Sequence, residues 1–97
     1  MSFTLVVDSA ATQEAKVGRV WYEGEKRGLG DRFAKALQAC YDRIEKNPYA
    51  FPLRKADFRH AMLHKFPYRV VFEVEGNTVF IYQVRHTSRK PHPKFGP

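Results

Sequence analysis

The sequence predicts an α+β fold of order β-α-α-β-β-β, in which a helical hairpin packs on one face of a small antiparallel sheet. Apolar residues alternate with a mixed set over residues 69–74, and residues 79–84 are rich in β-branched and aromatic side chains. The turn signal Gly76-Asn77 lies between these two segments, as expected for a β-hairpin. Residues 33–44 repeat apolar side chains at helical spacing. Gly28 and Gly30 form a short joint between two helical segments, which implies that these helices run antiparallel.

The first predicted helix follows a short strand. Residues 3–7 form an apolar run of strand length, and Asp8-Ser9 closes it with a helix N-cap signal. The segment from there to Arg27 contains no proline. We expect its apolar stripe to face the core, with Trp21 among the core residues. The stripe consists of Ala10, Val17, Val20 and Trp21.

The second predicted helix has the clearest periodicity in the chain. Asp31 is its expected cap, and Asn47-Pro48 ends it. Its apolar stripe comprises Phe33, Leu37, Cys40, Tyr41 and Ile44. Because Cys40 lies within this stripe, we expect a buried, inert thiol and no nucleophile.

The last three strands carry most of the histidines and several arginines. A two-residue loop at Gly76-Asn77 would pair Glu75 with Thr78, Phe72 with Ile81 and Val70 with Gln83. The helix-covered face would then hold Tyr68, Val70, Phe72, Val74, Val79 and Ile81. The uncovered face would hold Arg69, Val71, Glu73, Phe80, Tyr82, Val84 and His86. If Lys65 stands opposite Tyr68 across the Phe66-Pro67 bend, the uncovered face also gains His60, Met62 and His64.

Composition limits the function classes. The chain has 97 residues, enough for one domain over residues 1–97, with a basic, proline-containing tail at 88–97. A net charge of +7 and a pI near 9.8 favour a phosphate-bearing or acidic partner. A single cysteine excludes an internal disulfide, and no apolar run reaches membrane-spanning length. We therefore expect a cytoplasmic protein with no membrane contact.

A series of short motifs along nearly the whole chain resembles the RelE/ParE superfamily of toxins from bacterial type II toxin-antitoxin systems. The motifs are Gly28-Leu29-Gly30-Asp31-Arg32-Phe33, Ile44-Glu45-Lys46-Asn47-Pro48, Phe58-Arg59-His60, Phe66-Pro67-Tyr68-Arg69-Val70-Val71-Phe72 and His86-Thr87-Ser88-Arg89-Lys90-Pro91. In their residues these motifs are most similar to the ParE-like "plasmid stabilisation" branch. The resemblance implies a toxin neutralised by a cognate acidic antitoxin that folds on binding, with no cofactor. Within the superfamily, ParE-like members poison DNA gyrase, and RelE-like members cleave messenger RNA on the ribosome.

The resemblance also implies candidate catalytic residues for RNA cleavage. Arg69 corresponds to the strand arginine that RelE-like members place on the phosphate. His86 stands where several relatives carry a catalytic histidine or basic residue, and His60 where they commonly carry a lysine. Arg89 is the remaining basic candidate, and Phe95 or Tyr82 would stack on a base.

Each candidate also has an ordinary structural interpretation. His60 and His64 would serve as half-buried packing residues, and Arg69 would pair with Glu73 or with carboxylates of the first helix. The segment from His86 to Arg89 would fix the tail against the sheet.

Three positions depart from the RelE pattern. Met62 replaces a lysine, Thr87 falls about where an arginine is expected, and Phe95 replaces a C-terminal tyrosine. Each change removes a charge or a proton carrier, which favours the ParE-like branch.

A metal site and a basic surface remain to be considered. His60 and His64 on one strand would stand about 13 Å apart at roughly 3.3 Å per residue, too far to share one metal unless His92 joins them, so we expect no metal. A basic surface for phosphate or for the antitoxin is expected from Arg54, Lys55, Arg59, His64, Lys65, Arg85, Arg89, Lys90 and Lys94.

The sequence leaves three functions open. The first is a ParE-like toxin that inhibits DNA gyrase without being an enzyme itself, which is slightly favoured. The second is a metal-independent, ribosome-dependent messenger RNA endonuclease. The third is a degenerate, non-toxic partner in an antitoxin repressor complex.

Overall fold

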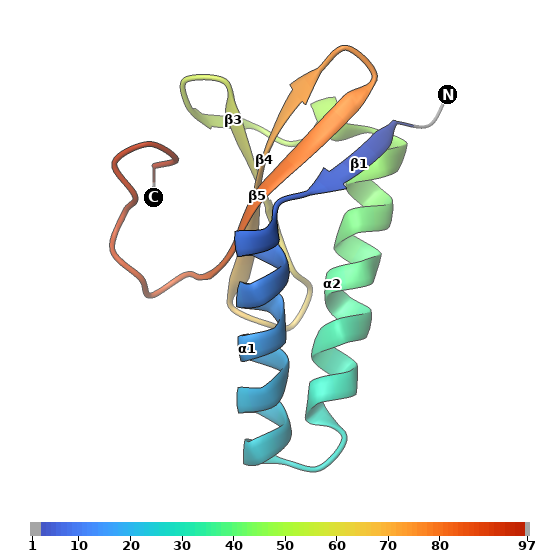
Figure 1. The fold of residues 1–97 in the computed structure, drawn as a ribbon, viewed down its shortest axis with the longest axis vertical. Helices are drawn as coiled ribbons and strands as arrows, with labels where there is room; N and C mark the ends of the chain where they lie inside the picture. Colours follow the sequence, from blue (N-terminus) through green and yellow to red (C-terminus); the bar gives the residue numbers. More distant parts are fainter. Residues whose placement is uncertain (1–2, 97) are drawn as a thin grey trace.

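The computed structural model describes residues 3–96, which fold into two helices packed on one face of a five-stranded sheet (Figure 1). Along the chain the elements are β1 (Thr4–Val7), α1 (Ser9–Glu25), α2 (Leu29–Lys46), the 3₁₀ turn η1 (Pro48–Ala50), β2 (Leu53–Lys55), β3 (Phe58–Met62), β4 (Tyr68–Glu75) and β5 (Thr78–His86). The α+β class and the helical hairpin are confirmed. Within residues 3–96, no helix is long and apolar enough to cross a bilayer.

The sheet differs from the predicted one in two respects. Its strand order is β1-β5-β4-β3-β2, and β1 pairs with β5 in parallel, so the sheet is mixed. Strand β2 lies between η1 and β3, where the sequence alone predicts no strand. Hydrophobic alternation has the same period in parallel and antiparallel strands, so it carries no information about the direction of an edge strand.

Helix α1 begins at the predicted cap but turns a different face to the core. The carboxylate of Asp8 accepts a hydrogen bond from the backbone N–H of Ala10 at 2.8 Å. The buried residues are Ala11, Gly18 and Tyr22. The predicted core stripe is wrong: Val17, Val20 and Trp21 are 60%, 72% and 58% exposed.

The choice of face on α1 follows from the fit to α2. Gly18 faces the ring of Phe33 so closely that an added Cβ would lie 3.1 Å from its Cζ atom. Small residues at this contact let the helices approach each other, whereas the larger side chains of Val17 and Trp21 would hold them apart. Burial on α1 is therefore set by shape rather than by hydrophobicity alone.

Helix α2 buries the predicted stripe. Phe33, Leu37, Cys40 and Ile44 are buried, and Tyr41 is partly buried. Its start differs from the prediction because the cap is Gly28, with φ at 86°, and Asp31 lies in the first turn. The carboxylate of Glu23 on α1 accepts hydrogen bonds from the N–H groups of Gly28 and Gly30, at 3.1 and 3.0 Å. This side chain satisfies donors that an α-helix leaves unpaired at its N-terminus.

The β4–β5 hairpin keeps the predicted turn but not the predicted register along its whole length. Glu75 pairs with Thr78, and Phe72 with Ile81, as expected. Beyond that point Val71 pairs with Gln83, so Tyr82 is an extra residue in β5 and forms a β-bulge.

The bulge changes the faces of all later residues in β5. Val70 pairs with Val84 instead of Gln83, and Tyr68 pairs with His86. Val84 therefore joins the helix-side core, and His86 moves to the helix-covered side. The prediction that these two residues share a face with Arg69 is wrong. Arg85 takes their place beside Arg69.

Strand β3 pairs two residues away from the predicted register. Met62 stands opposite Arg69 and His60 opposite Val71. A shift of two residues keeps the same face, so His60 and Met62 remain on the predicted side. The strand ends at Met62, however, and His64 lies exposed in the turn that follows.

The second face of the sheet is covered rather than open. A small cluster of Phe58, Val71 and Phe95, with Tyr82 packed against it, lies opposite the main helix-side core. Phe95 belongs to the segment after β5, which swings outward and returns toward β3 (Figure 1). This segment places the C-terminal residues over the face that the sequence predicts to be free.

Candidate functional site

Three cationic or titratable side chains meet on the second face of the sheet, one from each of three adjacent strands. We call His60, Arg69 and Arg85 the cationic cluster. Arg69 and Arg85 stand opposite each other across β4 and β5. An Nη1 atom of Arg69 lies 3.4 Å from Nδ1 of His60. The sequence thus predicts correctly that His60 and Arg69 share a face, and the bulge in β5 brings in Arg85.

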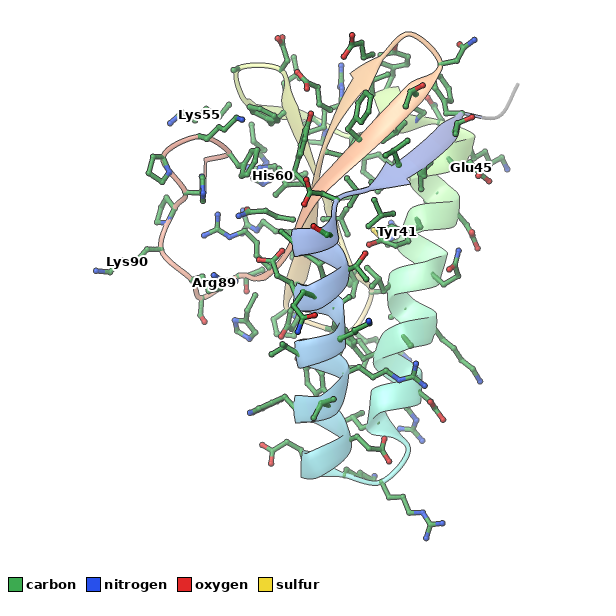
Figure 2. All side chains as sticks on the ribbon, viewed as in Figure 1. Tyr41, Glu45, Lys55, His60, Arg89 and Lys90 are labelled. Carbon is green, nitrogen blue, oxygen red and sulfur yellow. The ribbon has the colours of Figure 1, made fainter. Side chains whose placement is uncertain are left out.

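The C-terminal segment passes beside His60 (Figure 2) and bonds to two members of the cluster. His60 donates from Nε2 to the carbonyl oxygen of Phe95 at 2.9 Å. Arg85 donates from Nη1 to the carbonyl oxygen of Gly96 at 3.3 Å, and from Nη2 to that of Lys90. His60 and Arg85 are each only 4% exposed. Residues 90–96, which we call the tail strap, therefore shield these two donors from solvent.

An aromatic slot holds the end of the tail strap. The ring of Phe95 stacks on Tyr82 with centroids 5.5 Å apart, and meets the ring of Phe58 edge-on at 4.8 Å. The ring of His92 lies 4.7 Å from Phe95 on the strap itself. Phe95 and Tyr82, which the sequence offers as base-stacking residues, instead stack on each other.

The hydrogen bonds of His60 define its protonation state. A carbonyl oxygen only accepts, so Nε2 carries the proton, and a guanidinium only donates, so Nδ1 faces Arg69 as an acceptor. Burial lowers the pKa of His60 below its usual 6.5, and the charges of Arg69, Arg54 and Arg85 lower it further, against the opposing effect of the hydrogen bond to Phe95. The ring is therefore neutral near pH 7.

The neutral state of His60 predicts a pH dependence of stability. In the unfolded chain the pKa of His60 returns to about 6.5. Below that pH the unfolded state binds a proton at His60, whereas the folded state stays neutral there until its own lower pKa is reached. We expect the free energy of unfolding to fall as the pH drops from about 6.5 toward the lower folded pKa. Urea unfolding at pH 7.5 and 5.5 measures it, and His60→Gln should reduce the difference between the two values. An equal difference in His60→Gln and the parent chain would contradict the assignment, and His64→Gln on the exposed turn is the matched control.

Arg85 experiences the same crowding of positive charge. Burial lowers the pKa of its guanidinium, and the charges of Arg89 and Arg69 lower it further, against the opposing effect of the Glu14 carboxylate. Such a group is stabilised by acceptors, and the carbonyl groups of the tail strap supply two. The sequence places Arg85 only within a general basic surface.

The other two candidate catalytic residues lie elsewhere. The ring of His86 meets Tyr68 edge-on at 5.2 Å, and its Nδ1 accepts from the N–H of Ser88 at 3.0 Å. Arg89 donates to Glu14 on α1 at 3.3 Å. Both line an open groove of about 450 Å³ between α1 and the end of β5. The four candidates thus form two separate pairs, His60 with Arg69 and His86 with Arg89.

The predicted basic surface is also divided. Lys55 donates from Nζ to the carbonyl oxygen of Pro93 and so supports the tail strap. Arg59 donates to the carbonyl oxygen of Phe51 at 2.6 Å, and its guanidinium lies over the ring of Tyr49.

The remaining basic residues lie at other places around the sheet. His64 and Lys65 border a separate groove of about 690 Å³ beside α2. Arg54 lies in β2, and its charge acts on His60. The side chain of Lys90 is exposed (Figure 2), although its carbonyl group binds Arg85.

Two further titratable groups have structural environments. Cys40 is fully buried, and burial raises its pKa to about 11, as expected for an unreactive thiol. Burial and a hydrogen bond donated to Glu73 at 2.9 Å raise the pKa of Tyr82 to about 12. Across residues 3–96, no three His, Cys, Asp or Glu side chains gather closely enough to hold a metal ion.

The covering of the cluster is the feature that sequence reasoning misses. One signal for it exists: Phe95 is a single large apolar residue in an otherwise polar tail, followed by Gly96, which adopts a φ of 86°. A lone aromatic side chain at the end of a basic tail favours an anchoring role, because its large apolar ring is stabilised by burial. Its target on the sheet depends on the register of three strands.

Comparison with known proteins agrees with this fold. Residues 6–91 match the family model described as ParE toxin of type II toxin-antitoxin system, parDE. No curated protein matches.

Three solved structures resemble the fold. One from P. aeruginosa, described as a chromosomal ParDE toxin-antitoxin system, has 15% identity and a TM-score of 0.68 over 90% of this chain and 98% of that one. The isolated E. coli RelE toxin has 23% identity and a TM-score of 0.66, over 92% and 88%. The RelBE2 toxin-antitoxin complex from Mycobacterium tuberculosis has 17% identity and a TM-score of 0.61, over 89% and 99%. At these identities the structures show a common fold, and the family model, which spans most of the chain, shows the family. The chain belongs to the ParE toxins of type II toxin-antitoxin systems.

Proposed function

We propose that this toxin acts by binding and inhibiting DNA gyrase, and that a cognate acidic antitoxin neutralises it in the cytoplasm. One observation carries the choice of target: the four candidate catalytic residues do not converge. His60 and Arg69 lie beneath the tail strap, whereas His86 and Arg89 lie beside α1.

Metal-independent RNA cleavage requires these groups to act on one phosphate. A base must reach the 2′-hydroxyl, cations must contact the scissile phosphate, and an acid must protonate the leaving oxygen. Here both ring nitrogens of His60 are engaged within the protein. An inhibitor that works by binding needs no such constellation.

The charge of the chain supports the proposed antitoxin. A net charge of +7 favours association with an acidic segment and speeds the encounter. Two similar structures are described as a ParDE system and a RelBE2 complex, in which toxins of this fold are paired with antitoxins.

Pulse labelling after controlled induction tests the target in cells. We expect thymidine incorporation to fall before methionine incorporation, together with DNA damage signalling. In a purified assay the protein should inhibit supercoiling by gyrase. Methionine incorporation that collapses first would point to translation instead. If neither changes in well-expressed protein, the degenerate, non-toxic partner becomes the better hypothesis.

Two alanine variants separate binding from catalysis. Arg69→Ala and His86→Ala are expected to keep toxicity within a few-fold of the parent chain, because neither performs chemistry under this proposal. A nuclease would lose about 100-fold or more in rate from either substitution. Circular dichroism of both variants controls for folding.

One observation favours the ribosome-dependent endonuclease as the second candidate. Arg69 and His60 lie within contact distance on one face, which is a suitable start for phosphate binding and proton transfer. This candidate requires the tail strap to move. Cleavage of messenger RNA on purified ribosomes, abolished in Arg69→Ala, would establish it over gyrase inhibition.

A further inference from the structure

A groove of about 690 Å³ lies between the N-terminal part of α2 and the turn that joins β3 to β4. This volume is within the range of small-molecule sites, roughly 300–1,000 Å³. Its apolar lining consists of Tyr22, Leu29, Ala36, Ala39, Phe66 and Pro67. The hydroxyl group of Tyr22 is the only polar side-chain atom in this set. The lining therefore suits a ligand segment without polar atoms, such as an alkyl chain, because no group of that segment loses a hydrogen-bond partner on entry.

The remaining lining residues are basic. Arg32 and Lys35 come from α2, His64 and Lys65 come from the turn, and no carboxylate lines the groove. Within residues 3–96, the side chains of Arg32, Lys35 and Lys65 form no hydrogen bond or ion pair. Three cations thus border one apolar groove without a counter-charge, and an anion placed among them would interact favourably with each.

Two carboxylates of the helical hairpin are engaged elsewhere. Asp31 accepts a hydrogen bond from the guanidinium of Arg19. Glu23 accepts hydrogen bonds from backbone N–H groups at the start of α2. Both therefore have partners within the hairpin and do not neutralise the cations of the groove.

The turn that carries two of the basic residues has a fixed conformation. Lys65 adopts a φ of 68°, in the left-handed region that residues other than glycine rarely occupy. Hydrogen bonds hold the turn, from the N–H of Leu63 to the carbonyl oxygen of Tyr68 at 3.0 Å and from the N–H of Thr87 to that of Pro67 at 2.8 Å. Such backbone conformations persist where the surrounding structure imposes them, and they cluster at ligand sites. The turn therefore presents Lys65 to the groove from a fixed position.

We propose that this groove binds a single-chain anionic amphiphile, namely a medium-chain fatty acid. Its alkyl chain lies on the apolar lining, and its carboxylate lies among Arg32, Lys35 and Lys65. A nucleotide fits less well, because the polar edges of its base would meet a lining that offers one hydroxyl group. The site shares no residue with the cationic cluster or the tail strap, and the inference does not rest on gyrase being the target.

Isothermal titration calorimetry of the full chain with octanoate, decanoate and dodecanoate, each below its micelle-forming concentration, tests the ligand class. We expect one site per chain, with affinity rising about tenfold for each two added CH₂ groups, because each further CH₂ group is removed from water. Decyltrimethylammonium has an alkyl chain of similar length with a cationic head. It should bind at least about tenfold more weakly than decanoate, because the cations of the groove repel it.

Two variants locate the site. Ala39→Phe places a ring in the groove from an exposed position of α2 and should abolish decanoate binding. Lys35→Gln combined with Lys65→Gln should weaken binding about fivefold, because two cations are lost. The matched control combines Lys16→Gln with Lys46→Gln, which removes the same charge at exposed positions outside the groove and should leave the affinity unchanged. Circular dichroism of each variant controls for folding.

Several results would overturn the proposal. An affinity that is independent of chain length, or equal binding of decyltrimethylammonium, would remove the fatty acid as ligand. Unchanged decanoate binding by Ala39→Phe would place the ligand elsewhere. Tighter binding of adenosine monophosphate than of decanoate would make the groove a nucleotide site. Binding to phosphatidylglycerol vesicles without binding of monomeric decanoate would make it a membrane contact. None of these experiments contains gyrase, so their failure leaves the proposed target standing.

Discussion

Replacing Phe33 with alanine is expected to lower the free energy of unfolding by about 3–5 kcal/mol, the cost of removing a large ring from a closely packed core. Phe33 is fully buried where α1, α2 and the turn before β4 meet. Its ring lies 5.2 Å from Tyr22, 5.4 Å from Phe66 and 4.9 Å from Tyr68, measured between ring centroids. These three rings line the cavity that the substitution would leave.

Urea denaturation followed by circular dichroism measures this effect, with Trp21→Ala as the matched control. Trp21 is also an aromatic residue of the helical hairpin, but its side chain is 58% exposed. Its loss should cost less than about 1 kcal/mol, as for other surface substitutions. Equal costs for the two variants would mean that the helical hairpin packs through the stripe of α1 that the structure leaves exposed.

Gly30→Ala and Gly24→Ala are expected to change stability in opposite directions. A Cβ on Gly30 would lie 2.8 Å from the backbone carbonyl oxygen of Arg19 and 2.9 Å from Oε1 of Glu23. The backbone of α1 would have to move, and the N–H groups at the start of α2 would lose their acceptor. We expect a loss of about 1–3 kcal/mol.

Gly24 provides the matched glycine. It lies in the last part of α1 with no atom within 4 Å of an added Cβ. Alanine there removes the entropic cost of glycine in a helix and should stabilise the chain by about 0.5–1 kcal/mol. Thermal unfolding of both variants measures the difference. Stabilisation by Gly30→Ala would contradict the close approach of α1 to the start of α2.

Most helices and strands of this fold can be predicted from local sequence patterns. The stripe from Phe33 to Ile44, the cap at Asp8 and the turn at Gly76-Asn77 each depend on residues a few positions apart. Periodicity and turn chemistry act over that range, so the sequence is sufficient for them. The same patterns fail on α1, where two apolar stripes compete and the fit of Gly18 to Phe33 decides between them.

The composition of the candidate site is harder to predict from the sequence, because it depends on the register in which β3, β4 and β5 pair. His60 and Arg69 share a face in the predicted and the observed pairing, since the two differ by an even number of residues. One extra residue at Tyr82 is enough to exchange His86 for Arg85 in the cationic cluster. A bulge has no signature in hydrophobic alternation when the strand is apolar on both faces, as β5 is between Val79 and Val84.

Residue type and short-range spacing thus fix the α+β class, the helical hairpin, the basic charge and the resemblance to RelE/ParE toxins. The face that α1 buries, the direction of β1, the membership of the cationic cluster and its cover of residues 90–96 arise from contacts between residues far apart in the chain. Such contacts are selected by packing and by the pairing of buried donors with acceptors, which are properties of the assembled core. The spacing of residues within one segment therefore does not predict these contacts.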